Sequence, residues 1–377
     1  MKRITLIAIL AVAPILALSP AIAGSAAVPP TVGTKPVLTA TWPAAFTFTP
    51  RGDIFFANRL TGEIKVFNHR TAVTHTFFDV PGVTGDAGNE RGLLGLAIDP
   101  GFPTRPYVFA YATRMVNGTA RNQILRIRSS GGVGVSFHVI FTSSTPANTF
   151  HNGGHLLFGG GGNLYTLIGE AGDPANSQSL ATPAGKILRM TTAGKAPGNN
   201  RWGGLIFVTG VRNSFGFTFN PATHKLWETE NGPECNDEIN QFSNGDNGGW
   251  GPHETCDGTI GGTNQDGVNP RLPVQYYESV IAPTGTVFCP ASGCGLTAGT
   301  KGDLFFGTFD TQNIHEADPA DIPGTDAIVL TWGTGILSME RNPATGALYF
   351  SDSGGIFKLV PGCSPSGSAA CGQGVAP

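Results

Sequence analysis

Short runs of apolar residues recur along the chain, and the two runs of each pair are separated by a turn rich in proline or glycine. Six such strand–turn–strand units are present: FTFTPRGDIFFAN, GLAIDPGFPTRPYVFAY, LLFGGGGNLYTLI, FTFNPATHKLWETE, TVFCPASG followed by KGDLFFGTF, and MERNPATGALYFSD. Their turns contain Pro50, Pro100, Gly160, Pro221, Pro290 and Pro343, so neighbouring units are 50 to 69 residues apart. A repeat of this length with several short strands is typical of β-propeller blades.

Several units are followed by a further strand candidate, among them EIKVFN, QILRIRS, GKILRMT and GIFKLV. These segments help to supply the four strands that a propeller blade needs. The pattern therefore predicts an all-β chain folded as a six-bladed β-propeller, with one domain over residues 37–361. An array of β-sandwiches is the alternative, but such an array gives the repeat no reason to persist.

Both ends of the chain differ in composition from the repeats. Lys2 and Arg3 precede an apolar run and a small-residue site ending at Ala23, which is typical of a secretory signal peptide over residues 1–23. The alternative is an uncleaved anchor helix, but two prolines interrupt the run. We expect export to the periplasm or the medium, without a membrane span. Residues 24–36 and 362–377 are rich in small residues and proline, and are predicted to be flexible tails.

The low charge of the chain argues against two classes of partner, and its cysteines predict disulfides. Charged residues make up 13% of the chain and the formal net charge is −3, which gives no electrostatic reason to expect binding to nucleic acid or to an anionic membrane. The even number of cysteines, six, predicts disulfides in an exported protein. We expect nearest neighbours to pair: Cys235 with Cys256, Cys289 with Cys294, and Cys363 with Cys371. A zinc site is the weaker alternative, because the chain has no Cys-x-x-Cys pair.

The loops that enter the predicted strands contain the candidate chemistry. His151 precedes a Gly-Gly pair, which lets a ligand approach the backbone closely, and histidine is the commonest general base near neutral pH. We interpret His138, His155 and His224 as structural or solvated. Arg212 and Asn213 open another strand, where a guanidinium can stabilise an oxyanion, although a surface arginine is the plainer interpretation.

An acidic turn follows in the segment ENGPECNDEIN, which contains Glu230, Glu234, Asp237 and Glu238. Carboxylate and carbonyl oxygens in a turn suit Ca²⁺, although the spacing is not that of an EF-hand loop. An acidic turn without metal is the other interpretation.

Five segments, in this order, resemble the soluble glucose and sorbosone dehydrogenase family, which includes the bacterial aldose sugar dehydrogenases: ERGLLGLAIDPGF, HNGGHLLF, GVRNSFGFTFNPATHKLWETENGPECNDEIN, NGGWG and GDLFFGTF. The resemblance covers most of the mature chain and is most specific over residues 210–250. It implies a six-bladed propeller with pyrroloquinoline quinone (PQQ) over the central channel and a Ca²⁺ ion bridging the quinone and the protein. It also implies a sugar substrate, an aldose oxidised at its anomeric carbon.

The resemblance also implies roles for individual residues. His151 matches the general base, and Arg212, with Asn213 beside it, matches the arginine near the reactive quinone oxygens. Glu90 stands at a cofactor-binding position where other members have glutamine. The backbone carbonyls of Gly232 and Pro233 match ligands of the cofactor-associated Ca²⁺. Glu238 and the Gly248 carbonyl match a second, structural Ca²⁺ site.

Besides Glu90, three positions depart from the family pattern. Asp310 replaces an expected lysine, and Gly335 and Leu337 stand near the positions of expected arginines that pair with the quinone's carboxylates. These losses favour a second reading, a non-catalytic propeller of the same family that binds a glycan or a protein partner. A third reading is a Ca²⁺-dependent propeller lactonase, in which the acidic turn would hold a catalytic Ca²⁺ that polarises an ester.

Overall fold

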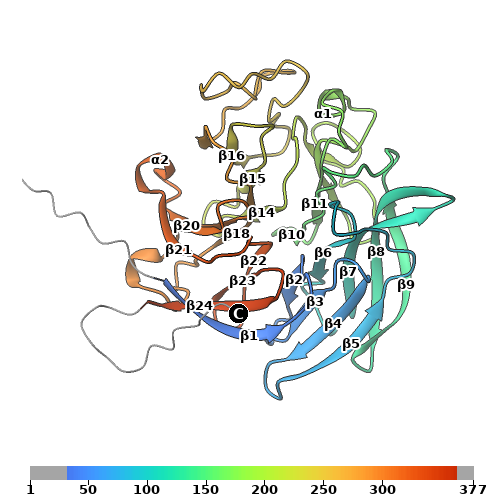
Figure 1. Ribbon diagram of the computed structural model, residues 1–377. Helices are drawn as coiled ribbons and strands as arrows, with labels where there is room; N and C mark the ends of the chain where they lie inside the picture. Colours follow the sequence, from blue (N-terminus) through green and yellow to red (C-terminus); the bar gives the residue numbers. More distant parts are fainter. Residues whose placement is uncertain (1–31, 363–377) are drawn as a thin grey trace, which may run out of the picture.

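Six four-stranded antiparallel sheets surround a common centre in the computed structural model, which describes residues 32–362 (Figure 1). The described residues contain little helix: α1 (Ala175–Gln178), α2 (Ile322–Thr325) and a 3₁₀ turn at Ala298–Thr300. The prediction of an all-β, six-bladed propeller is confirmed. The predicted signal peptide, residues 1–23, and the Cys363–Cys371 pair lie outside the described residues.

Five of the blades are each built from four consecutive strands. The first blade contains β2 (Phe46–Phe48), β3 (Ile54–Ala57), β4 (Glu63–Asn68) and β5 (Val73–Asp79). The second contains β6 (Leu93–Ile98), β7 (Tyr107–Val116), β8 (Thr119–Ser130) and β9 (Val133–Thr142). The third contains β10 (Leu156–Phe158), β11 (Leu164–Ile168), β12 (Lys186–Met190) and β13 (Ile206–Val208). The fourth contains β14 (Gly216–Phe219), β15 (Leu226–Glu230), β16 (Asp237–Phe242) and β17 (Gln275–Tyr277). The fifth contains β18 (Pro283–Phe288), β19 (Leu304–Thr308), β20 (Asn313–Ala317) and β21 (Ala327–Thr331).

Both ends of the described chain meet in the sixth blade. It contains β22 (Ser338–Arg341), β23 (Leu348–Ser351) and β24 (Gly355–Pro361), and its fourth strand is β1 (Val32–Thr39), which pairs antiparallel with β24. Residues 32–36 are therefore part of a paired strand, so the prediction of a flexible tail over residues 24–36 is wrong for this part. Residues 32–36 pair with β24 and do not form a tail, because β24 would otherwise be an edge strand with unpaired backbone N–H and C=O groups.

The predicted strand–turn–strand units form the first two strands of every blade. In the first blade, for example, the turn after β2 is closed by hydrogen bonds from the Thr49 N–H to the Asp53 carbonyl (2.8 Å) and from the Gly52 N–H to the Thr49 carbonyl (2.9 Å). Gly52 has a positive φ of 96°, which glycine adopts without steric cost. Local turn chemistry therefore explains why the repeat is visible in the sequence.

Apolar clusters fill the space between neighbouring blades. Phe55 and Ile64 of the first blade pack in one cluster with Leu96 and Val108 of the second. Near the centre the innermost strands approach so closely that a Cβ at Gly216 would clash with the Thr284 carbonyl of the next blade. Neither α1 nor α2, within the described residues, has the length or the apolar character of a membrane-spanning helix.

Two disulfides are present in the described part of the chain. Cys235 bonds to Cys256, and Cys289 bonds to Cys294, which confirms two of the three predicted pairs. The first of them connects the turn after β15 to the long segment between β16 and β17.

Candidate active site

A cavity of about 320 Å³ opens at one end of the ring, and all six blades contribute residues to it. Its lining comes from the loops that enter the innermost strands and from the hairpin loops at the same end of the blades. Two sides of the cavity differ in chemistry. On one side Glu90 lines the cavity, and hydrogen bonds connect it, directly or in turn, to His151, Asn213, Glu170 and Arg212; we call this set the polar wall. On the other side Phe309, Asp310 and Leu337 line the cavity, and Gly335 packs against Phe309; we call these four residues the distal wall.

His151 lies in the loop before β10 with a left-handed backbone, at φ 61°. Its N–H donates to Glu90 Oε2 at 2.6 Å, and its ring Nδ1 lies 2.5 Å from Glu170 Oε1. An ionised carboxylate only accepts hydrogen bonds, so Nδ1 carries the proton and Nε2 is the basic nitrogen. The His151 side chain is 20% exposed, so the ring is partly accessible from solvent.

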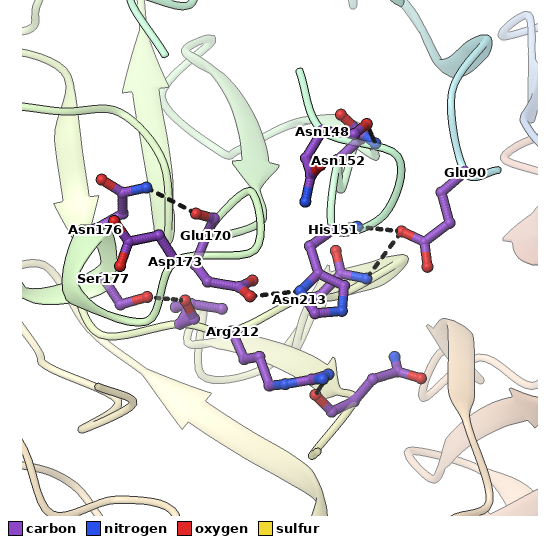
Figure 2. A network of polar contacts seen from close by, with 12 residues as sticks. Glu90, Asn148, His151, Asn152, Glu170, Asp173, Asn176, Ser177, Arg212 and Asn213 are labelled. Atoms are coloured by element: carbon purple, nitrogen blue, oxygen red, sulfur yellow. Dashed lines mark hydrogen bonds and ion pairs between the residues drawn. The ribbon is translucent and has the colours of Figure 1, made fainter. Parts of the chain in front are cut away.

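Glu170 follows β11 and is held from three directions (Figure 2). Its N–H donates to the Arg212 carbonyl at 2.9 Å, and its own carbonyl accepts from Asn176 Nδ2 at 2.9 Å. Its side chain is only 3% exposed, and Oε2 has no protein partner. No sequence pattern predicts a role for Glu170. Its acidic side chain directly follows the apolar run LYTLIG, but this position does not indicate that it contacts His151.

Arg212 and Asn213 complete the polar wall (Figure 2). Arg212 Nη1 donates to the Asn231 carbonyl at 2.8 Å, and its guanidinium carbon lies 5.3 Å from the centre of the Trp250 ring. The Arg212 N–H donates to Glu230. Asn213 Nδ2 donates to the same Glu90 oxygen as His151, at 3.2 Å. The structure thus brings together all four residues predicted for chemistry and cofactor contact on this side.

Glu90 connects His151 and Asn213, because its Oε2 accepts a hydrogen bond from each of them. Burial raises the pKa of its carboxyl above the ordinary value, and the hydrogen bonds from His151 and Asn213 oppose that shift. Arg91 does not enter the cavity, because it donates to the carbonyls of Ala147 and Asn148. Its guanidinium therefore holds the loop that leads to His151.

Two of the predicted calcium ligands, Glu238 and Gly248, are connected through one asparagine. Glu238 is buried, and Asn264 Nδ2 bridges its Oε2 (3.1 Å) and the Gly248 carbonyl (2.7 Å). Asn264 Oδ1 is buried without a partner. Glu238 and Gly248 are therefore close together, with further hard oxygens beside them.

Other members of the acidic turn have different surroundings. Asp237 accepts from the N–H groups of Gly232, Ile281 and Ala282, each at 2.7 Å, so it fixes the turn that contains Gly232 and Pro233. Glu234 is exposed. Within residues 32–362 no group of three or more His, Cys, Asp or Glu side chains is arranged to hold a metal ion. A calcium site here would therefore depend on carbonyl and amide oxygens as well.

Three buried carboxyls, those of Glu228, Glu230 and Glu238, surround the side-chain amide of Asn240. Burial raises the pKa of all three, that of Glu228 to about 8. Three like charges in so little space repel each other unless protons or a cation offset them. Glu228 Oε1 also has no partner.

The distal wall has little of this polarity. Leu337 and Phe309 line the cavity, and a Cβ at Gly335 would clash with the Phe309 ring. Asp310 also lines the cavity, but no described residue donates a hydrogen bond to its side chain. The sequence predicts that His155 is structural or solvated; it lines the cavity as well, just before β10. Burial lowers the pKa of His155 to about 4, so it is neutral at physiological pH.

Sequence comparison identifies the protein family. The family model for glucose/sorbosone dehydrogenases matches residues 40–357. The chain belongs to the glucose/sorbosone dehydrogenase family. This family is one of quinoprotein sugar dehydrogenases, which are oxidoreductases.

Individual members of the glucose/sorbosone dehydrogenase family are similar over part of their length. Quinoprotein glucose dehydrogenase B of Acinetobacter calcoaceticus is 28% identical over 244 residues, 55% of this chain and 50% of that protein. Aldose sugar dehydrogenase YliI of Escherichia coli is 29% identical over 218 residues, 55% of this chain and 58% of that protein. The aligned regions thus span little more than half of these relatives.

One solved structure of a family member matches this chain over a longer part of its length than these two sequences do. The PQQ-bound aldose sugar dehydrogenase from Streptomyces coelicolor has a TM-score of 0.73 and 26% identity, and the match covers 88% of this chain and 99% of that chain. The chain therefore shares its fold with this family member over almost its whole described length.

The cavity fits the cofactor of the family on one side only. The polar wall offers a base, an arginine and hard oxygens, which suit a quinone and a cation. The distal wall offers two apolar side chains and a carboxylate, where a quinone with three carboxylates would need positive charge. The match is therefore good at the reactive end and poor at the other end.

Proposed function

We propose that this protein is an exported sugar dehydrogenase that uses PQQ and Ca²⁺ to oxidise an aldose at its anomeric carbon. The observation that carries this proposal is the pair formed by His151 and Glu170, with Arg212 joined to it through the backbone of Glu170. Relatives named quinoprotein glucose dehydrogenase and aldose sugar dehydrogenase support the same reaction class. The bound PQQ of the Streptomyces coelicolor relative supports the cofactor.

His151 acts as the general base. Glu170 holds the proton on Nδ1, so Nε2 accepts the proton of the anomeric hydroxyl. When bound, the quinone supplies the two-electron acceptor for the hydride that leaves the sugar carbon. Glu90 fixes the backbone of His151 and the amide of Asn213 at the same time, so the base keeps its position before a ligand enters.

Arg212 stabilises negative charge that develops on the acceptor side. Its guanidinium is oriented by the Asn231 carbonyl and by the Trp250 ring, and Asn231 lines the cavity. A fixed cation of this kind needs no reorganisation during the reaction. The carbonyls of Gly232 and Pro233 would hold the Ca²⁺ beside the cofactor, and Glu238 with the Gly248 carbonyl would hold the second ion.

The test is the rate of dye-linked aldose oxidation after addition of PQQ and Ca²⁺. His151→Ala should lower the rate by about 10² to 10⁴, the usual contribution of a positioned base. His138→Ala, on the exposed strand β9, is the matched control and should leave the rate unchanged.

A non-catalytic propeller that binds a glycan or a protein is the second candidate, and the distal wall is the observation that favours it. If the wild-type protein with PQQ and Ca²⁺ oxidises no aldose from a broad panel, the dehydrogenase proposal fails and the binding propeller takes its place.

A further inference from the structure

The charged side chains that line the cavity decide whether it attracts an anionic ligand. Three residues with ordinarily charged side chains line it: Arg59, Glu90 and Asp310. His155 adds no charge at neutral pH, because burial lowers its pKa to about 4. One cation thus stands against two carboxylates in the lining. Arg212 and Glu170 of the polar wall add one cation and one carboxylate beside it, so the site has no excess of positive charge for an anionic ligand.

Arg59 is moreover already engaged with the protein. Its Nη1 donates to the carbonyls of Asn89 (2.5 Å) and Arg91 (3.1 Å), and its Nη2 donates to the Asp86 carbonyl (3.2 Å). Its guanidinium carbon lies 5.0 Å from the centre of the Trp42 ring, and the side chain is buried. Arg59 therefore holds the loop that contains Glu90 with three of its five N–H groups, and its Nε is buried without a partner.

Position 335 of the distal wall has no room for a cationic side chain. Phe309 packs against Gly335, so any side chain at position 335 would have to displace the ring. Leu337 fills the neighbouring surface of the cavity, and Asp310 stands beside Phe309 with a carboxylate that no described residue neutralises. A carboxylate placed here would meet apolar surface and a like charge, which disfavours it.

We propose that the distal wall is a subsite for an uncharged group of the cofactor or ligand, and that it selects against carboxylates. The cavity then prefers a planar quinone that has fewer negative charges than PQQ. This inference rests on the proposed function for the identity of the ligand class, but it concerns binding and not turnover.

The experiment compares PQQ with its trimethyl ester, in which all three carboxylates are replaced by uncharged methyl esters, and the variants below test the distal wall alone. Binding to the full mature protein is followed by quenching of tryptophan fluorescence, at fixed Ca²⁺. The wild type should bind the ester at least as tightly as the acid. Leu337→Arg and Asp310→Lys should each tighten binding of the acid by about 10-fold, the effect of one charge-assisted hydrogen bond, and should leave binding of the ester nearly unchanged.

Val133→Arg adds the same charge on the exposed strand β9 and serves as the control for a long-range effect. Because Asp310 is exposed, Asp310→Lys keeps the test valid if Leu337→Arg does not fold. The inference is overturned if the wild type binds the acid 10-fold more tightly than the ester. It is also overturned if the folded cationic variants gain no affinity for the acid. A wild type that prefers the ester but oxidises no aldose would refute the proposed function and leave this inference standing.

Discussion

The polar wall and the distal wall of the cavity are organised in opposite ways. On the polar wall the backbone or side chain of Glu90, His151, Glu170 and Asn213 is joined to at least one other member of the set by a hydrogen bond. On the distal wall Phe309 and Leu337 offer no hydrogen-bonding side chain, and Asp310 has no donor from a described residue. The protein therefore holds the groups proposed for the reaction in place through its own hydrogen bonds, whereas the distal wall offers a ligand mainly apolar surface.

This difference between the two walls indicates which part of the site tolerates amino-acid substitution. A residue in a connected polar network is costly to alter, because its partners are left unsatisfied in a buried place. A residue on the distal wall has few partners to lose. Ligand preference should therefore change through the distal wall, while the reaction depends on the polar wall.

The largest expected effect comes from breaking the polar wall at Glu170. Glu170→Gln keeps the shape of the side chain but lets its amide donate to Nδ1, which allows the wrong tautomer of His151. We expect kcat to fall by about 10² to 10⁴, as for an altered acid in a catalytic triad. Asp173→Asn, in the same loop but without contact to His151, is the control, and steady-state kinetics of both variants is the measurement. An equal loss in the control would show that the loop, and not the pair, is responsible.

Removal of calcium should have the next largest effect. A ligand that binds only the folded state stabilises it by about 2.7 kcal/mol at 100 times its Kd. Chelation should therefore lower the thermal midpoint of the wild type, and Glu238→Gln should reduce this response. Glu234→Gln changes an exposed carboxyl of the same turn and should keep the full response. Identical thermal midpoints with and without chelator in the wild type would refute the prediction that the site binds calcium.

A smaller effect is expected at Glu340, on the innermost strand of the blade that supplies part of the distal wall. Burial raises the pKa of Glu340 from its ordinary value of 4.5 to about 8, and no described residue donates a hydrogen bond to its carboxyl. The folded state thus binds the proton more tightly than the unfolded chain. Its stabilising contribution is fully present below pH 4.5 and is lost as the pH rises through 8.

Glu340→Gln removes this titration. Relative to the variant, the wild type should lose about 1–3 kcal/mol of unfolding free energy between pH 4 and pH 9. Denaturant unfolding at several pH values measures the difference. Parallel stability profiles of the two proteins would show that this carboxyl is well solvated by the channel.

The fold was largely predictable from the sequence, because its repeated unit is local. Pro50 and Gly52 shape a turn between two strands that lie next to each other in the chain, and the same holds in the other blades. The strand β1 was missed because its partner β24 lies more than 300 residues further along the chain. No local pattern contains that information.

The candidate site was predictable in part for the same reason. His151, Arg212 and Glu90 stand in distinctive motifs. The partnership of His151 with Glu170 joins two loops across the third blade, and neither loop indicates the other. The contact between Phe309 and Gly335 likewise depends on the packing of two blades, so the sequence shows the loss of positive charge but not the ring that takes its place.

The pairing of β1 with β24 sets an order in time for the synthesis of this protein. Each of the first five sheets is contained in one continuous segment, so it can form as soon as that segment has emerged. The sixth sheet needs residues 32–39 together with residues 338–361, so β1 waits without its partner while nearly all of the chain is made. During that interval the ring is open and the cavity lacks its sixth side. A nascent chain stalled before residue 355 would contain the polar wall but no closed propeller to hold it in place.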